Sequence, residues 1–188
     1  MVIDFDRSLG WKALEERLEA TDSPRQRQIL TTVIEHSKAE AACDLDGLMA
    51  TLVDEPQYHF WVAGKDRGPK GYAAIRQYYE DYVNSGGAVI CSPKERIIVD
   101  DHSVCTESTL TTLASGRIAK SRGYSVDDVS AHYLLRMRNT VLWSFDDDGR
   151  AFGEDAYSMY DADDWEKVAP GDLPDFYVEY LTGIGHTI

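Results

Sequence analysis

The chain has 188 residues, the size of one globular domain that buries roughly 70% of its unfolded surface. Its hydrophobic content of 43% is too high for a disordered chain. The formal net charge of −14 argues against nucleic acid and against anionic membrane surfaces as partners, because both attract clusters of lysine and arginine. No stretch approaches the ~20 apolar residues of a membrane span, and the first residues lack the pattern of a signal peptide. We therefore expect a cytoplasmic protein without a membrane or nucleic-acid partner.

The three cysteines Cys43, Cys91 and Cys105 are far apart and odd in number. Disulfide frameworks and zinc sites need even counts or close pairs, so we predict small buried thiols in a reducing compartment. The sequence has no Gly-rich phosphate loop, no G-x-S-x-G and no H-E-x-x-H motif. We therefore expect neither a metal site nor a cofactor.

The first half of the chain has helical periodicity. Residues 7–20 and the segment from 24 to 41 carry apolar residues three or four apart, and Ser23 followed by Pro24 is typical of a helix start. Asp44 is the predicted cap of a third helix. A short aromatic strand at 58–62 then precedes a fourth helix at 72–83.

After residue 84 the pattern changes to alternation with a period of two. Strands are predicted over 88–92, 95–101, 103–114 and 130–145, and 115–128 is expected to be a long loop. The Asp-Gly pair at 148–149 predicts a tight turn into a strand at 150–160. Residues 161–168 are expected to start a short helix capped by Asp161 or Asp163. Helices followed by consecutive strands indicate an α+β fold, with helices packed on a strongly curved, mostly antiparallel sheet around a closed-end cavity.

Three segments carry a family resemblance: "CDLDGLMATLVDEPQYHFW", "KGYAAIRQYYEDY" and "FDDDGRAFGEDAY". In order and spacing they resemble the opening, the central helix and the closing hairpin of the SnoaL-like, NTF2-like superfamily, and together they span about 43–159. The resemblance implies a cone-shaped α+β barrel in a single domain, with a core of about 24–161 between an N-terminal helical extension, 1–22, and a C-terminal extension, 162–188.

The chain departs from the family pattern at the end of the hairpin. Relatives often end it with Tyr-x-Asp, whereas Tyr157 is followed here by Ser158 and Met159. A terminal carboxylate that serves relatives is therefore missing from this chain.

The superfamily includes polyketide cyclases, ketosteroid isomerases, dehydratases, epoxide hydrolases and non-catalytic modules, so the fold does not settle the function. Our first hypothesis is a cofactor-independent enzyme that transfers protons on a hydrophobic, oxygenated small molecule in the pocket, as an isomerase, dehydratase or cyclase. The alternative is a non-catalytic small-molecule-binding or association module. We also expect a symmetric homodimer through the exposed face of the sheet.

Glu154 is the first candidate for catalysis. It shares a strand face with Ala156 and Ser158, and the resemblance places it where relatives carry a glutamate at the pocket. A carboxyl group in an apolar cone has a raised pKa, which suits proton transfer near neutral pH. The alternative is a structural glutamate that pairs with Arg136 or Arg138 across the hairpin.

Three further groups are candidates. His132 and Arg136 are expected to share a face of the long strand and to face that glutamate, where they would polarise a carbonyl and move a proton; the alternative is a mixed-charge outer face. His59 is either a catalytic or a structural histidine. Glu107 is a weaker candidate acid, which a neighbouring arginine would neutralise.

Aromatic side chains are assigned to substrate binding or, alternatively, to the core: Tyr58, Trp61, Tyr79, Trp143 and Tyr157.

Overall fold

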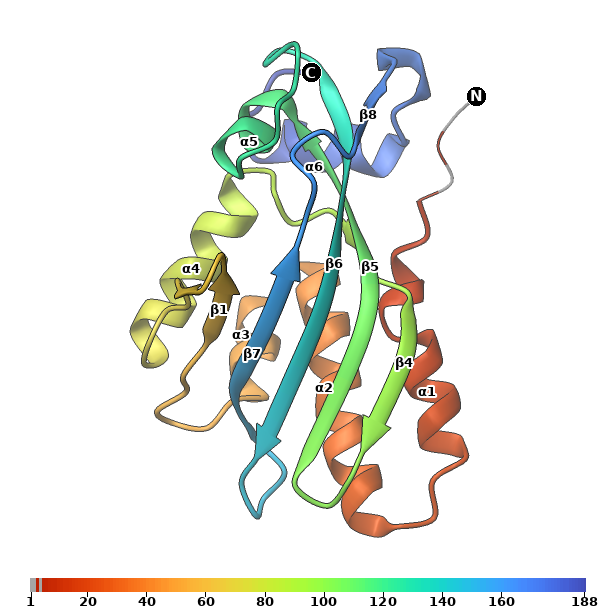
Figure 1. The fold of residues 1–188 in the computed structure, drawn as a ribbon, viewed down its shortest axis with the longest axis vertical. Helices are drawn as coiled ribbons and strands as arrows, with labels where there is room; N and C mark the ends of the chain where they lie inside the picture. Colours follow the sequence, from red (N-terminus) through yellow and green to blue (C-terminus); the bar gives the residue numbers. More distant parts are fainter. Residues whose placement is uncertain (1–2, 4) are drawn as a thin grey trace.

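The structure, a computed structural model, describes residue 3 and residues 5–188. Figure 1 shows a curved sheet with helices gathered on one of its faces. Within the described residues these helices are α1 (Lys12–Glu19), α2 (Pro24–Ala42), α3 (Leu45–Ala50) and α4 (Tyr72–Asn84). The predicted α+β class is therefore confirmed.

The sheet of the described residues has eight strands and does not close. Its order is β2-β1-β7-β6-β5-β3, while β4 also pairs with β5 and β8 with β6. All of these pairs are antiparallel except β1 with β7, so the predicted mostly antiparallel sheet is confirmed. The strands are β1 (His59–Val62), β2 (Lys65–Asp66), β3 (Ile90–Cys91), β4 (Lys94–Val99), β5 (Ser103–Ser115), β6 (His132–Phe145), β7 (Ala151–Met159) and β8 (Trp165–Val168).

Local sequence signals explain where α2 and α3 begin. The Ser23 side chain accepts a hydrogen bond from the Gln26 N–H, and proline occupies the first helical turn of α2. The helix ends at Cys43, which adopts a left-handed conformation with φ of 55°. The side chain of Asp44 then accepts from the Gly47 N–H at 3.0 Å and caps α3. Both predicted caps are confirmed.

Two segments differ from the sequence prediction. The expected loop at 115–128 contains a short helix, α5 (Gly116–Ser121), capped by the Ser115 side chain. The prediction of a helix at 161–168 is wrong, because Trp165–Val168 form strand β8. Strand β7 pairs with β6 only from Arg138 onward, so it leaves the backbone of residues 132–135 without hydrogen-bond partners on that edge. Strand β8 supplies these partners.

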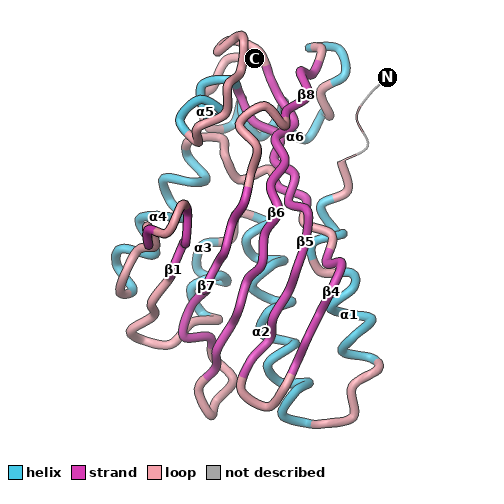
Figure 2. Tube along the Cα trace, in the orientation of Figure 1, coloured by secondary structure: helices cyan, strands magenta, loops and turns pink. Residues whose placement is uncertain are grey.

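Strands β5 and β6 run through two packed regions, as the tube in Figure 2 shows. In the lower region of that view, α1–α4 pack on the sheet, and the fully buried Leu14 of α1 belongs to this core. In the upper region, α5, β8 and α6 (Asp175–Gly183) pack around Leu113, Tyr133 and Tyr177. Short 3-10 helices, η1 (Arg7–Gly10) and η2 (Pro170–Asp172), complete the chain.

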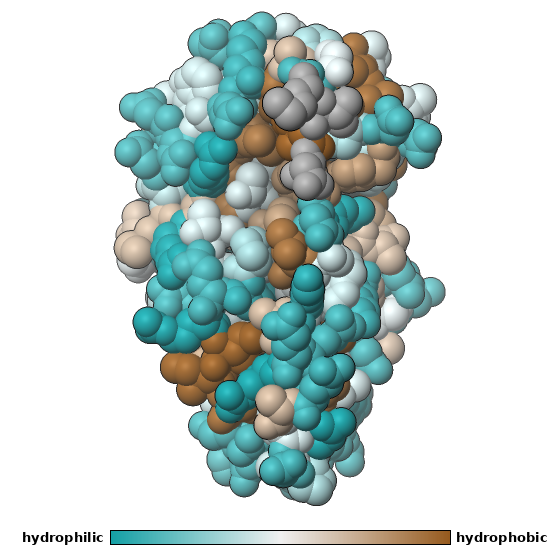
Figure 3. Space-filling model, turned by 90° about the vertical axis from the view of Figure 1, so that its right-hand side faces the viewer, coloured by the Kyte–Doolittle hydropathy of each residue, from teal (hydrophilic) through white to brown (hydrophobic). Residues whose placement is uncertain are grey.

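The surface agrees with the acidic, polar composition. On the face in Figure 3, hydrophilic side chains predominate and hydrophobic ones gather in separate patches. No helix in the described part of the chain is long and apolar enough to cross a membrane. Cys43, Cys91 and Cys105 are free thiols, as predicted, but they are half-buried rather than buried.

Candidate active site

A cavity of about 570 Å³ lies between the concave face of the sheet and helices α2 and α4. Alternate residues of two paired strands form its floor, because side chains of one strand face repeat every second residue. These cross-strand pairs are Trp143 with Glu154, Val141 with Ala156, and Asn139 with Ser158. One face of α2 forms the opposite wall, with Val33, His36, Ser37 and Glu40.

His36 is held in one orientation beside the cavity. Its Nδ1 lies 2.7 Å from the Thr51 hydroxyl, which donates its single hydrogen to the Leu48 carbonyl at 2.6 Å. The hydroxyl must therefore accept from a protonated Nδ1. The other ring nitrogen, Nε2, lies 3.2 Å from the Tyr79 hydroxyl and 3.5 Å from Glu154 Oε1. The histidine thus presents its second nitrogen to a carboxylate.

Glu154 is fixed by a chain of phenols. The Tyr79 hydroxyl donates to Glu154 Oε1 at 3.3 Å and lies 3.2 Å from the Tyr58 hydroxyl. Burial, reinforced by the negative charge of Glu154, raises the pKa of both tyrosines, so they stay protonated donors at neutral pH. Only 16% of the Glu154 side chain is exposed. The result is an oriented carboxylate at one end of the cavity.

Glu40 and Lys94 add two ionisable groups to the same cavity. Among the described residues the Glu40 carboxyl group has no hydrogen-bond or ion-pair partner, and burial together with the charge of Glu154 raises its pKa to about 7. Lys94 Nζ donates to the Ser92 hydroxyl at 3.0 Å, and burial lowers the pKa of this lysine. Near neutral pH, Glu40 is divided between its acid and its base form, which suits a proton-transfer group.

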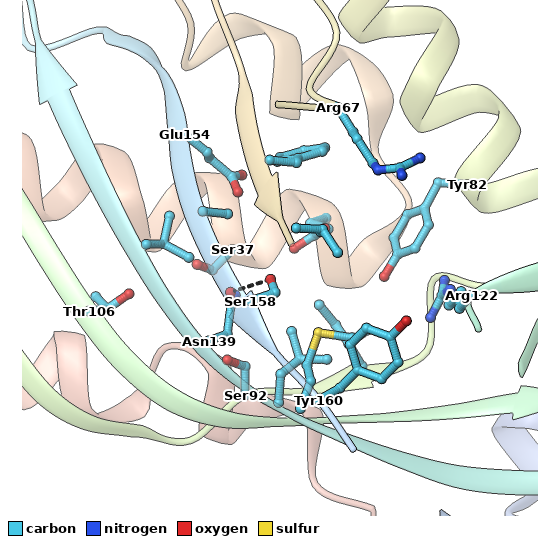
Figure 4. Close-up of a pocket in the computed structure, with 18 of the residues that line it drawn as sticks. Ser37, Arg67, Tyr82, Ser92, Thr106, Arg122, Asn139, Glu154, Ser158 and Tyr160 are labelled. Carbon is cyan, nitrogen blue, oxygen red and sulfur yellow. Dashed lines mark hydrogen bonds between the residues drawn. The ribbon is translucent and has the colours of Figure 1, made fainter. Parts of the chain in front are cut away.

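The middle of the cavity combines apolar walls with a few polar groups. Figure 4 shows the Ser158 hydroxyl bonded to Asn139, whose Oδ1 accepts at 2.9 Å. This bond leaves the Asn139 amide hydrogens for a ligand. Apolar side chains that line this part are Phe60, Val62, Leu110, Met137 and Val141.

The structure places His132 and Arg136 away from the cavity. His132 is buried in the upper region, with Nδ1 2.9 Å from the Tyr177 hydroxyl. Arg136 lies on the outer face and donates to Glu166 at 2.9 Å. The expectation that both face Glu154 is wrong, because alternation along β6 turns the odd-numbered residues 137–143 inward and β7 does not pair with 132–136.

The predicted arginine partner for Glu154 is also absent from the described contacts. Arg138 donates instead to Glu95 and to Glu107, each at 2.5 Å, on the outer face. Arg138 therefore neutralises Glu107, which was the alternative to a catalytic role for this glutamate.

The outward face of the paired strands β1 and β7 holds three of the candidates. His59 Nδ1 lies 2.8 Å from Asp66 Oδ2, and its ring stacks on Trp61 with centroids 6.2 Å apart. Trp61 in turn stacks on Tyr157, which is 51% exposed. None of these lines the cavity, because alternation turns Phe60 and its strand-face neighbours inward.

The remaining aromatic candidates belong to the cavity region. Trp143 lines the cavity and packs edge-on against His36, with ring centroids 4.9 Å apart. Tyr58 and Tyr79 lie behind the cavity wall as hydrogen-bond donors, and both are almost fully buried. Sequence reasoning therefore identified one ionisable group of this cavity, Glu154, and the phenols that hold it.

Sequence reasoning missed His36, Glu40 and Lys94. The two α2 residues follow Val33 at spacings of three and seven, so they continue the apolar stripe of that helix with polar side chains. That switch from apolar to polar on one helix face was the available signal. Lys94 gave no signal, because a register irregularity between Lys94 and Arg96 interrupts the alternation along β4.

No protein-family model matches the sequence, and no curated protein matches it. Solved structures are similar in fold. A Shewanella denitrificans protein described as a SnoaL-like polyketide cyclase has a TM-score of 0.58 at 12% identity, over 73% of this chain and 92% of that one. A Mycobacterium tuberculosis protein in complex with estradiol-17β-hemisuccinate has a TM-score of 0.52 at 12% identity, over 74% and 98%. An LEH-like epoxide hydrolase from M. tuberculosis has a TM-score of 0.52 at 17% identity, over 72% and 86%.

The chain therefore has the fold of SnoaL-like and NTF2-like proteins, as the sequence resemblance predicted. Enzymes of different activity share this fold, so it does not by itself assign a reaction.

Proposed function

We propose that this protein is a cofactor-independent enzyme that transfers a proton next to a carbonyl group of a hydrophobic, oxygenated small molecule. Isomerisation, dehydration and cyclisation all begin with this step. One observation carries the proposal: Glu154, His36, Glu40 and Lys94 converge on one cavity whose middle is largely apolar. Several ionisable groups in a single cleft are typical of acid–base catalysis, and the pKa values of two of these groups, Glu40 and Lys94, are shifted by burial.

In the proposed reaction Glu154 is the base. It takes a proton from the carbon beside the carbonyl, the C–H electron pair forms a C=C bond, and the carbonyl π electrons move to oxygen. The Asn139 amide and the Lys94 ammonium face the cavity as donors for that oxygen. The proton is then returned to the substrate, so the step needs no oxidant or reductant. Tyr79 keeps the carboxylate oriented throughout.

The unpartnered carboxyl group of Glu40 supports an enzyme over a non-catalytic module. A half-buried carboxyl group without a partner, such as that of Glu40, lowers the stability of a protein, and a site that only binds an apolar ligand gains nothing from it. A carboxyl group with a pKa of about 7 is useful where protons are exchanged at neutral pH.

The test is deuterium exchange at the carbon next to the carbonyl in a panel of aryl alkyl ketones, followed by NMR in D₂O. We expect Glu154→Gln to slow exchange by about 100-fold or more, the usual worth of a general base. Asp155→Asn is the matched control, because the adjacent residue is also acidic but faces away from the cavity.

Two outcomes would contradict this proposal. Equal exchange rates in Glu154→Gln and the wild type would remove Glu154 as the base. Ketones that bind the wild-type protein without any exchange would favour the non-catalytic binding module.

We also propose a homodimer through the outer face of the sheet. Large apolar side chains are exposed there, including Tyr157 at 51% and Met159 at 71%. Light scattering after size exclusion should give twice the chain mass for the wild type and a single chain mass for Met159→Glu.

A further inference from the structure

The cavity is elongated, and its two ends differ in chemistry. Along β7 and just beyond it, Glu154, Ala156, Ser158 and Tyr160 line it in turn. At about 3.3 Å per strand residue, the first and last of these lie roughly 20 Å apart. Glu154 is therefore at one end, and Tyr160, which is one of the exposed residues of the lining, marks the other end, where the cavity opens.

Two arginines stand at this mouth. Arg67 follows β2 and Arg122 follows α5, so segments far apart in the sequence bring them together. Figure 4 shows their guanidinium groups on either side of Tyr82. Neither forms an ion pair within the described part of the chain, and no hydrogen bond of the Arg67 side chain is found there.

Arg122 is anchored but not neutralised. Its Nη2 donates to the Gly87 carbonyl at 3.3 Å, and its guanidinium carbon lies 5.6 Å from the centre of the Tyr82 ring. A guanidinium has five N–H donors in a planar fork. Most donors of the two arginines are therefore open to a ligand, and one of the forks is already held in place.

The charge pattern of the molecule makes this placement informative. The chain carries a net charge of −14, and on the outer face Arg136 and Arg138 are neutralised by carboxylates. Such a molecule repels an anionic ligand unless the entrance supplies local positive charge. Arginine also binds carboxylate, sulfate and phosphate groups in bidentate geometry.

We propose that the cavity takes an elongated amphipathic anion. Its carboxylate, sulfate or phosphate group binds Arg67 and Arg122 at the mouth. Its apolar body lies over Met137 and Val141, and its carbonyl end reaches Glu154. Only the placement of the carbonyl end at Glu154 rests on the proposed function. The anionic group at the two arginines is the new part, and it defines the class of substrate.

The probes are two fluorescent compounds with one scaffold. 8-Anilinonaphthalene-1-sulfonate carries an anionic group, and N-phenyl-1-naphthylamine is the same scaffold without it. We expect Arg67→Gln to weaken binding of the sulfonate by about fivefold to tenfold and to leave binding of the neutral probe within about twofold. Raising the salt concentration should weaken binding of the sulfonate alone.

Matched variants locate the charge that binds the anion. Arg117→Gln removes an exposed arginine of α5 that does not line the cavity, and it should change neither probe. Arg122→Gln should act like Arg67→Gln. Arg122→Lys keeps the positive charge and should retain part of the preference for the sulfonate even if the glutamine variant does not fold.

Three results would overturn the inference. One is loss of affinity for both probes to the same extent in the Arg67 variant. Another is unchanged sulfonate binding in both Arg67→Gln and Arg122→Gln. The third is a sulfonate preference that disappears only in Lys94→Gln, which would place the anion inside the cavity. Probe binding does not depend on turnover: Glu154→Gln should keep the sulfonate preference, so failure at the mouth and failure of the proposed reaction are distinguishable.

Discussion

His36 and His132 are both buried histidines, yet the structure gives them different surroundings. Their exposed fractions are 1% and 5%, and each bonds a tyrosine hydroxyl: Tyr79 for His36 and Tyr177 for His132. Only His36 also lies within 3.5 Å of a carboxylate and lines a cavity. His132 is packed against α6 in the upper region, and burial alone lowers its pKa.

The comparison teaches what turns a titratable side chain into a candidate for catalysis. Burial and a hydrogen bond are common to both histidines, so neither feature discriminates between them. What differs is a second ionisable group within reach and open space for a substrate. By this criterion the lower region carries the chemistry, and the upper region provides packing.

Among the variants that test this comparison, those of the two histidines should differ most in activity. His36→Asn should slow ketone deuterium exchange by about 10-fold to 100-fold, because Glu154 loses the group that faces it. His132→Asn should leave the exchange rate of the folded protein within about twofold. NMR exchange rates, normalised to the folded fraction from circular dichroism, provide the measurement. A rate loss confined to the His132 variant would reverse the assignment of the two regions.

The next effect concerns how the ionised carboxyl group of Glu40 lowers the free energy of unfolding. The pKa of Glu40 is about 7 in the folded state, against an ordinary 4.5. The folded state therefore binds the proton more tightly, and stability falls as pH rises from about 4.5 through 7. Glu40→Gln should raise the free energy of unfolding at pH 8 by on the order of 2 kcal/mol. This value is smaller than the pKa shift alone would give, because solvent in the cavity screens the charge. At pH 4.5 the same substitution should leave the free energy of unfolding almost unchanged.

Glu35→Gln is the control for this measurement, because Glu35 is exposed on the same helix. Urea denaturation at the two pH values gives the free energies. A Glu40→Gln gain of equal size at both pH values would show that the carboxyl group does not titrate as described.

The smallest effect compares the two tyrosines. Tyr177→Phe leaves His132 Nδ1 without its partner in a packed core, so it should lower the free energy of unfolding by about 1–3 kcal/mol. Tyr79→Phe should cost less, about 1 kcal/mol, because two of the groups that contact its hydroxyl, His36 and Glu154, line the cavity and can bond a water there. Urea midpoints check both values. A larger loss for Tyr79→Phe would mean that the cavity is closed to water at this end.

Sequence alone determined the features that depend on neighbours along the chain. Ser23, Pro24 and Asp44 set the helix starts because their side chains and ring geometry act within one turn. Alternation along β7 placed Glu154 on one face with Ala156 and Ser158, and the structure shows that this face lines the cavity. The order of three degenerate motifs then indicated the superfamily fold.

Tertiary structure decided everything that depends on which distant surfaces meet. Register and curvature of the sheet sent His132 into a separate core and turned Arg136 outward. Packing of α2 over the concave face brought Glu40 to the cavity, and an irregular step in β4 brought Lys94 there. Periodicity specifies the faces of an element, but only long-range packing decides whether a face meets a core, a cavity or solvent.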